Sequence, residues 1–115
     1  MAVAYNTTID QGADWYLTIT YENPNGTPIN ITNYTSALQI RSLPSDPTTV
    51  LSLSTGSGIT ITGATGTVAV RATAAQTGAI DEGTYYYDLE ITAPSTGVVT
   101  RLVQGQVVVS PEVTR

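Results

Sequence analysis

An alternation of apolar and polar residues with a period of two constrains this chain more than any other feature of its sequence. In residues 15–21 and again in 84–92, nearly every second side chain is apolar, and most of those between are polar. Side chains two apart on an extended strand lie on the same face, so each segment predicts a strand with one buried face. No segment of ten or more residues has the period of an α-helix, and the chain is therefore predicted to be all-β.

Turns rich in Gly, Pro and Asn divide the chain into short strands, because Pro fixes φ and Gly accepts a positive φ. The clearest turns lie at residues 23–26, 55–58, 62–66 and 94–97. About seven to eight strands separated in this way predict a β-sandwich or a barrel. The one exception is Thr73 with Gln76 three residues later, a capping-box spacing that predicts a short helical turn near residues 73–77.

The stretch from Asp81 to Tyr87 narrows this to an immunoglobulin-like antiparallel β-sandwich of about seven to eight strands. In such domains a tyrosine at the start of strand F donates its hydroxyl to the backbone a few residues upstream, forming a tyrosine corner. We expect Tyr85 to do so around residues 78–81. The Cys that follows two residues later in antibody domains is Tyr87 here, which predicts an aromatic, disulfide-free core.

Residues at alternate positions of a predicted strand lie on one face, and those on the apolar face are predicted to form that core. They are Trp15, Leu17, Ile19, Leu38, Ile40, Val68, Val70, Tyr85, Tyr87, Leu89 and Ile91.

The residue types present limit the possible chemistry. The 115 residues predict one domain, spanning 1–115. There is no Cys and no His, so neither a Ser–His nor a Cys–His nucleophilic pair can form. Asp88 and Glu90 share the outer face of one predicted strand, but a Ca²⁺ site usually gathers about six or more oxygens from a loop. We interpret them as part of a solvated polar face and predict no enzymatic activity, no cofactor and no metal site.

The charge balance limits the possible partners. The net charge is −5 and all four cations are arginines, which argues against binding a nucleic-acid backbone, because that requires clustered cations. No stretch approaches the ~20 apolar residues of a membrane span. Charged residues make up only 11% of the chain, against about 25% in ordinary domains, which suits a surface that contacts other protein.

The final strand carries apolar residues on both faces. Val99, Val103, Val107 and Val109 share one parity, and Val98, Leu102 and Val108 share the other. Either a β-bulge at Gly105 exchanges the faces midway, or a second chain covers the outer face. With the outward tyrosines and the neighbouring arginines, this predicts a protein interface of Tyr16, Tyr86, Val98, Leu102, Val108, Arg101 and Arg115.

Several segments, taken in order, resemble the small immunoglobulin-like domains in virion proteins of tailed bacteriophages, particularly tail and baseplate modules. The comparison is with the N-terminal domain of the upper baseplate proteins of lactococcal phages. The resemblance covers nearly the whole chain from about residue 9. It is carried by Asp10–Ala13, Gly26–Asn30, Asn33–Thr35, Gln39–Arg41, Gly83–Glu90, Val99–Gly105 and the ending Val107–Arg115.

This resemblance implies a non-enzymatic structural protein, a tail, baseplate or fibre-adaptor component, made in the host bacterial cytoplasm and located in the virion. Its implied partners are other virion proteins and copies of itself, with no nucleic acid and no membrane. A capsid decoration protein is the nearest alternative. A carbohydrate-binding β-sandwich module is an alternative of another class, and it would need Tyr16, Tyr86 or Trp15 as an exposed platform.

Overall fold

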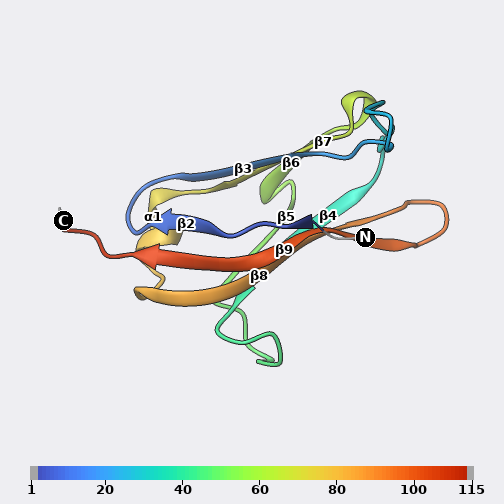
Figure 1. Ribbon diagram of the computed structural model, residues 1–115. Coiled ribbons are helices and arrows are strands. Elements are labelled where there is room, and N and C mark those ends of the chain that lie inside the picture. Colours follow the sequence, from blue (N-terminus) through green and yellow to red (C-terminus); the bar gives the residue numbers. More distant parts are fainter. Residues whose placement is uncertain (1–2, 114–115) are drawn as a thin grey trace.

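The computed structural model describes residues 3–113, which form nine strands, one 3-10 turn and one short α-helix (Figure 1). The all-β prediction is confirmed. The strands are β1 (Val3–Ala4), β2 (Thr7–Asp10), β3 (Trp15–Thr20), β4 (Thr35–Arg41), β5 (Leu51–Thr55), β6 (Gly58–Thr62), β7 (Thr67–Ala72), β8 (Gly83–Thr92) and β9 (Val99–Ser110). The 3-10 turn is η1 (Gly63–Thr65), and the helix is α1 (Ala74–Gly78). No helix within residues 3–113 is both long enough and apolar enough to cross a membrane.

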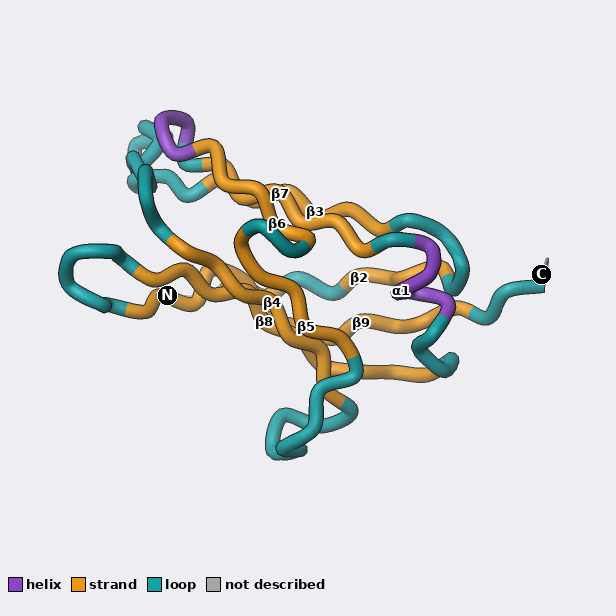
Figure 2. The backbone as a smooth tube through the Cα atoms, turned by 180° about the vertical axis from the view of Figure 1, so that it is seen from behind, coloured by secondary structure: helices purple, strands orange, loops and turns teal. Residues whose placement is uncertain are grey.

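All nine strands belong to one mixed sheet that curls into a nearly barrel-shaped molecule. The hydrogen-bonded order is β1-β9-β8-β4-β5-β6-β7-β3, with β2 also pairing with β9. Figures 1 and 2 show β3, β6 and β7 as one layer, facing a second layer that contains β4, β8 and β9. The layers are linked by a short pairing of β5 with β6.

The prediction of purely antiparallel sheets is wrong at three pairings. β1 and β2 run parallel to β9, and β5 runs parallel to β6. β1 and β2 are far from β9 in the sequence, so no turn motif reveals their pairing. β5 and β6 are joined by the turn at residues 56–57, and their parallel pairing covers only the two residues on each side of that turn. β1 and β2 were not predicted, and Pro28 forms an isolated antiparallel bridge with Glu22.

The core lies between the two layers, and the predicted inward residues occupy it. All of them are buried except Ile19, which is partly exposed but packs against the core. The core also takes residues that strand parity did not nominate, including Ile9 from β2 and Ile31 and Ile80 from loops. Ile31 and Ile80 lie outside the strands, so no alternating pattern in the sequence reveals their burial.

The helical turn forms where the capping box predicts it. Thr73 is the N-cap of α1, with its side chain and that of Gln76 bonded reciprocally to the backbone. Thr77 on α1 is buried, and its hydroxyl donates to the Ala13 carbonyl at 2.8 Å. The helix therefore fastens the turn before β3 to the end of β7.

The tyrosine corner is also present. The Tyr85 hydroxyl donates to the Asp81 carbonyl oxygen at 2.7 Å, inside the predicted window. Burial, followed by the nearby Asp81 charge, raises the pKa of the Tyr85 hydroxyl. The corner therefore joins the loop after α1 to the start of β8.

Replacing Tyr85 with Phe should cost about 0.5–1.5 kcal/mol of unfolding free energy without changing the fold, because one hydrogen bond is lost and its carbonyl partner remains. Urea denaturation of both proteins measures this difference. Tyr86→Phe is the matched control, since within residues 3–113 the Tyr86 hydroxyl accepts one long hydrogen bond, from the Gln106 amide at 3.4 Å on the outer face. Equal midpoints for Tyr85→Phe and the parent chain would contradict a stabilising corner.

Candidate interaction surface on the β4–β8–β9 face

The outer face of β4, β8 and β9 carries its side chains in three cross-strand rows. Alternation along each strand points these residues away from the core, and antiparallel pairing aligns them. The rows are Arg41–Tyr86–Gln106, Gln39–Asp88–Gln104 and Ala37–Glu90–Arg101. Opposite side chains in a sheet lie close enough to interact, so the rows form one continuous polar surface.

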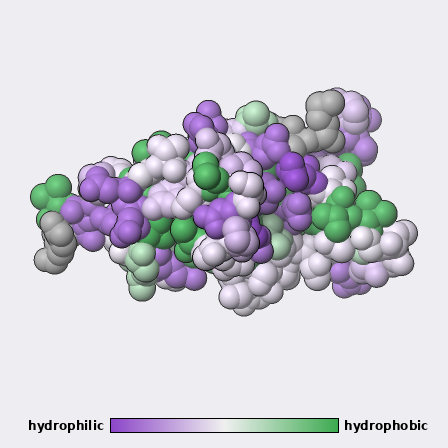
Figure 3. All heavy atoms as spheres, turned by 90° about the horizontal axis from the view of Figure 1, so that it is seen from below, coloured by the Kyte–Doolittle hydropathy of each residue, from purple (hydrophilic) through white to green (hydrophobic). Residues whose placement is uncertain are grey.

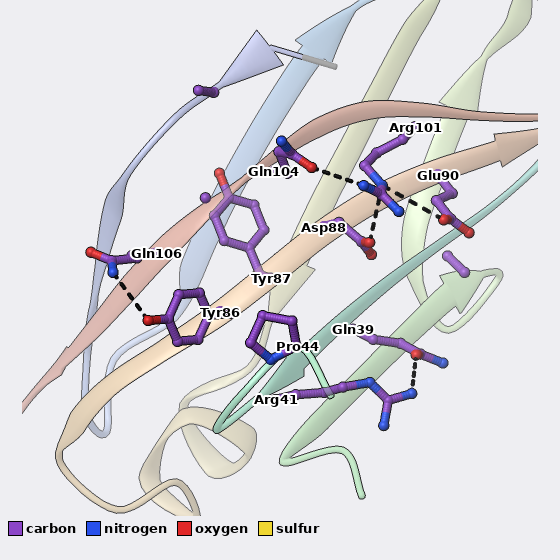
Figure 4. Close-up of a pocket in the computed structure, with 13 residues that line it drawn as sticks. Gln39, Arg41, Pro44, Tyr86, Tyr87, Asp88, Glu90, Arg101, Gln104 and Gln106 are labelled. Carbon is purple, nitrogen blue, oxygen red and sulfur yellow. Dashed lines mark hydrogen bonds and ion pairs between the residues drawn. The ribbon is translucent and has the colours of Figure 1, made fainter. Parts of the chain in front are cut away.

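This surface forms the floor of a hollow of about 640 Å³ (Figure 4). Pro44, in the loop after β4, lines it at one side. Ala4 of β1 and Gly105 of β9 line it elsewhere. Elements far apart in the sequence therefore meet around the polar rows.

Charge on the floor is balanced and largely paired. The Arg101 Nε lies 3.3 Å from Asp88 Oδ2 and 3.9 Å from Glu90 Oε2, and its Nη1 donates to the Gln104 side chain at 2.9 Å. Such exposed pairs add little stability. They hold the arginine in one orientation across β8 and β9.

Arg41, on the opposite side of the floor, is held in a similar way. Its guanidinium donates to the Gln39 side chain and to the Asp46 carbonyl, both at 2.8 Å. The second bond fastens the loop that contains Pro44 to the sheet. Asp88 and Glu90, in contrast, lie beside the guanidinium of Arg101. The part of the chain that the structure describes has no cluster of three or more His, Cys, Asp or Glu residues suited to a metal.

Gly105 allows the segment between β1 and β2 to approach the backbone of β9 closely beside the hollow. A Cβ at this position would collide with the Tyr5 carbonyl oxygen. That same oxygen accepts a hydrogen bond from the Tyr87 hydroxyl at 2.7 Å. Burial, with a smaller contribution from Tyr5, raises the pKa of Tyr87 to about 12. Gly105 therefore serves close backbone approach, and the alternative that placed a bulge at this residue is wrong.

The bulge in β9 lies instead at Leu102. Leu89 pairs with Val103 while the next residue, Glu90, pairs with Arg101, so Leu102 is the extra residue. Both Leu102 and Val103 are buried, with Leu102 only 6% exposed. The prediction that Leu102 lies at the interface is therefore wrong, because the bulge turns two successive side chains inward.

The same bulge carries Val99 to the outer face, opposite to its predicted side. Val99 is 56% exposed and Val98, in the preceding turn, is 58% exposed. Figure 3 shows hydrophobic side chains gathered at the end of the molecule that carries this hairpin. Val108 is 44% exposed on the outer face of β9, opposite Thr84. Val98 and Val99 are named the apolar hairpin tip below.

Tyr16 lies on the other layer, away from the hollow, so the predicted interface residues do not form one surface. Tyr16 is 65% exposed, with the Arg71 guanidinium 5.9 Å from the ring centre. Arg71 also pairs with Asp14 at 2.7 Å. Of the other predicted interface residues, Tyr86 and Arg101 line the hollow, and Arg115 lies outside the described residues.

Asp14 should titrate below its ordinary value of 3.8, because Arg71 donates a hydrogen bond to it and the Ala74 backbone N–H donates another. A lowered folded pKa means that the contribution to stability is complete above about pH 3.8 and is lost as the pH falls through the folded pKa. NMR titration of the Asp14 carboxyl group measures the midpoint, which should move back toward 3.8 in Arg71→Gln. Arg101→Gln is the control and should leave the midpoint in place. Identical midpoints in Arg71→Gln and the parent chain would rule out the pairing.

Sequence reasoning missed the amides of the hollow, Gln39, Gln104 and Gln106. Strand parity does place Gln39 on an outer face. It could not show that β4 and β9 flank β8, nor that the loop at Pro44 overhangs them. Neither a search of models of known protein families nor a search of curated proteins finds a match to this chain.

Proposed function

We propose that this chain is a non-enzymatic structural protein of a bacteriophage virion, a tail, baseplate or fibre-adaptor component that acts through protein–protein contacts. An immunoglobulin-like sandwich is part of the proposal. Two features support that fold. The order β9-β8-β4-β5 parallels strands G, F, C and C′ of variable-type domains, and β3-β7-β6 parallels B, E and D. The corner at Tyr85 stands at the start of the strand equivalent to F.

The observation that carries the functional proposal is the apolar hairpin tip beside a charged surface. Protein interfaces combine an apolar centre with a polar rim. Val98 and Val99 lie three and two residues before Arg101, which belongs to the balanced rows of the hollow. Burial of apolar surface contributes about 25 cal/mol per Å². Rim charges that are already oriented steer the approach of a partner more than they add affinity.

The test is Val99→Asp in particles of the virus that carries the gene. A carboxylate in the apolar centre of a contact should reduce incorporation by about tenfold or more, because 1.4 kcal/mol suffices for that factor. Quantitative mass spectrometry of purified particles counts the copies. Val113→Asp is the matched control, since Val113 is also exposed but lies near the chain end opposite to the hairpin. Normal occupancy of a folded Val99→Asp chain would exclude the tip as the contact.

Location in the particle separates the tail role from capsid decoration. A gold-labelled antibody against the chain, viewed by electron microscopy of intact particles, should mark the tail end. Label distributed over the head would replace the tail proposal with decoration, and unlabelled particles would reject both.

Saccharide binding is a second candidate, favoured by the composition of the hollow. The Tyr86 ring lies among the amides of Gln39, Gln104 and Gln106, and neutral sugars are bound by an aromatic face together with planar donors and acceptors. Of the three aromatic residues that such a module could use, Trp15 is buried, as strand alternation predicts, and Tyr16 lies on the other layer, which leaves Tyr86. A glycan array should then lose signal with Tyr86→Ala and keep it with Tyr16→Ala. An array without any signal removes this candidate.

A further inference from the structure

The outer edge of β3 has no partner within the described residues. β3 ends the hydrogen-bonded order of the sheet and pairs only with β7. Just beyond β3, the Tyr21 N–H donates to the Gly66 carbonyl at 2.7 Å, which continues the hydrogen-bond ladder between β3 and β7. The backbone groups of the odd-numbered residues of β3 therefore point toward β7. Alternate residues of a strand point their backbone groups to opposite sides. The N–H and C=O groups of Tyr16, Thr18 and Thr20 therefore point to the open edge.

This edge lacks the devices that normally prevent strand addition. Proteins protect open edges with charged side chains, prolines, bulges or very short strands, whereas Trp15–Thr20 is a regular six-residue strand without charge, Pro or Gly. The opposite edge differs, because it is formed by two very short strands, β1 and β2, which are interrupted at residues 5–6. Side chains near the open edge are also incompletely covered, since Tyr16 is exposed and Ile19 is only partly buried.

We propose that a second copy of this chain adds antiparallel to β3 across a twofold axis at Leu17. The β3-β7-β6 layers of the two copies then join into one continuous sheet. Tyr16 of each copy lies opposite Thr18 of the other, and the two edges complete each other's hydrogen bonds. A twofold contact of this kind is self-complementary and closes after two copies.

Charge and side-chain fit select this register. With the axis at Leu17, Asp14 lies opposite Thr20 of the second copy. Moving the axis to Thr18 would set Asp14 opposite Glu22, and like charges directly opposite are unfavourable. The selected register also brings the two Tyr16 rings into diagonal contact across the axis, within the reach of aromatic side chains. It sets Trp15 opposite the incompletely covered Ile19 on the inner side.

The inference adds to the proposed function by naming a surface through which copies meet. The test of the β3 dimer uses the isolated chain. The dimer proposal can therefore fail while the virion proposal stands, and the virion proposal can fail while the dimer proposal stands. The hairpin tip and the hollow take no part in it.

Sedimentation equilibrium of the parent chain should give a dimer, and Thr18→Pro should give a monomer with an unchanged far-UV circular dichroism spectrum. Proline at this position removes only an N–H that points to the open edge, which edge strands tolerate. Leu17→Pro is the contrasting variant, because it removes a bond to β7 and should disrupt the fold. A parent chain that stays monomeric at millimolar concentration overturns the proposal. The partner of the β3 edge would then be a strand of another protein. A dimer that persists in Thr18→Pro also overturns it.

Disulfide trapping tests the register even if Thr18→Pro does not fold. The chain has no Cys, so a mixture of Tyr16→Cys and Thr18→Cys variants can cross-link only between copies. Opposite residues of a hydrogen-bonded antiparallel pair are about 5.5 Å apart at Cα, within the range of about 4.4–6.8 Å that a disulfide spans. The mixed dimer should be the major product on a non-reducing gel. Tyr16→Cys mixed with Thr60→Cys is the control, since Thr60 lies on β6, inside the sheet. No excess of mixed dimer over this control contradicts the register.

Discussion

Replacing Leu102 with Asp should leave the chain largely unfolded at room temperature. Leu102 is the extra residue of the β9 bulge and is 6% exposed. Loss of a buried leucine costs about 2–5 kcal/mol, and an unpaired carboxylate in the core adds several kcal/mol more. Together these terms approach the whole stability of a typical domain, about 5–15 kcal/mol. Far-UV circular dichroism and urea denaturation measure the result.

Val108→Asp is the matched control for this experiment. Val108 also lies on β9 and has the same parity as Leu102, but it is 44% exposed beside Thr84. Its substitution should change stability by roughly 0.5 kcal/mol or less, as most surface changes do. If both variants fold equally well, Leu102 points outward and the bulge is absent. The comparison therefore distinguishes the observed register from a strand of uninterrupted alternation.

Leu89→Ala should lower the free energy of unfolding by about 2–5 kcal/mol, because it removes buried methyl groups and leaves a cavity. Leu89 pairs with Leu38 on one side and Val103 on the other, and all three are fully buried. Each neighbour is fixed in a strand, so the site has little freedom to collapse around the missing atoms. The shift of the denaturant midpoint, at an unchanged slope, measures the loss.

Ile19→Ala is the control for Leu89→Ala. Strand parity assigns both residues to the core, but Ile19 lies at the open edge and is only partly buried. In the Thr18→Pro monomer its truncation leaves space that is open to water, so the cost should be clearly smaller than that of Leu89→Ala. A larger loss for Ile19→Ala in the parent chain than in Thr18→Pro would mean that a second copy at β3 covers Ile19 in solution.

The two proposed contact surfaces lie on different parts of the molecule. The apolar hairpin tip extends from β8 and β9, while the open edge belongs to β3 in the other layer. A chain with both contacts can meet a copy through one surface and a different virion protein through the other. Combining Val99→Asp with Thr18→Pro should therefore abolish both associations, while each single change leaves one intact.

The sequence alone determined the features that depend on near neighbours. Alternation in β3 and β8 identified the buried faces, because the side-chain period of a strand is local. The corner at Tyr85 and the capping box at Thr73 were also predictable, since each joins groups within four residues of one another.

Only the tertiary structure decided which strands lie side by side, and with them the candidate surfaces. Backbone hydrogen bonds carry no residue code, so the parallel partners of β9 and the open edge of β3 cannot be read from side chains. The bulge at Leu102 likewise depends on the register between β8 and β9, whereas the sequence indicated Gly105 as its position. Gly105 was needed instead for the close approach of the Tyr5 carbonyl, a contact between residues a hundred positions apart that no local pattern encodes.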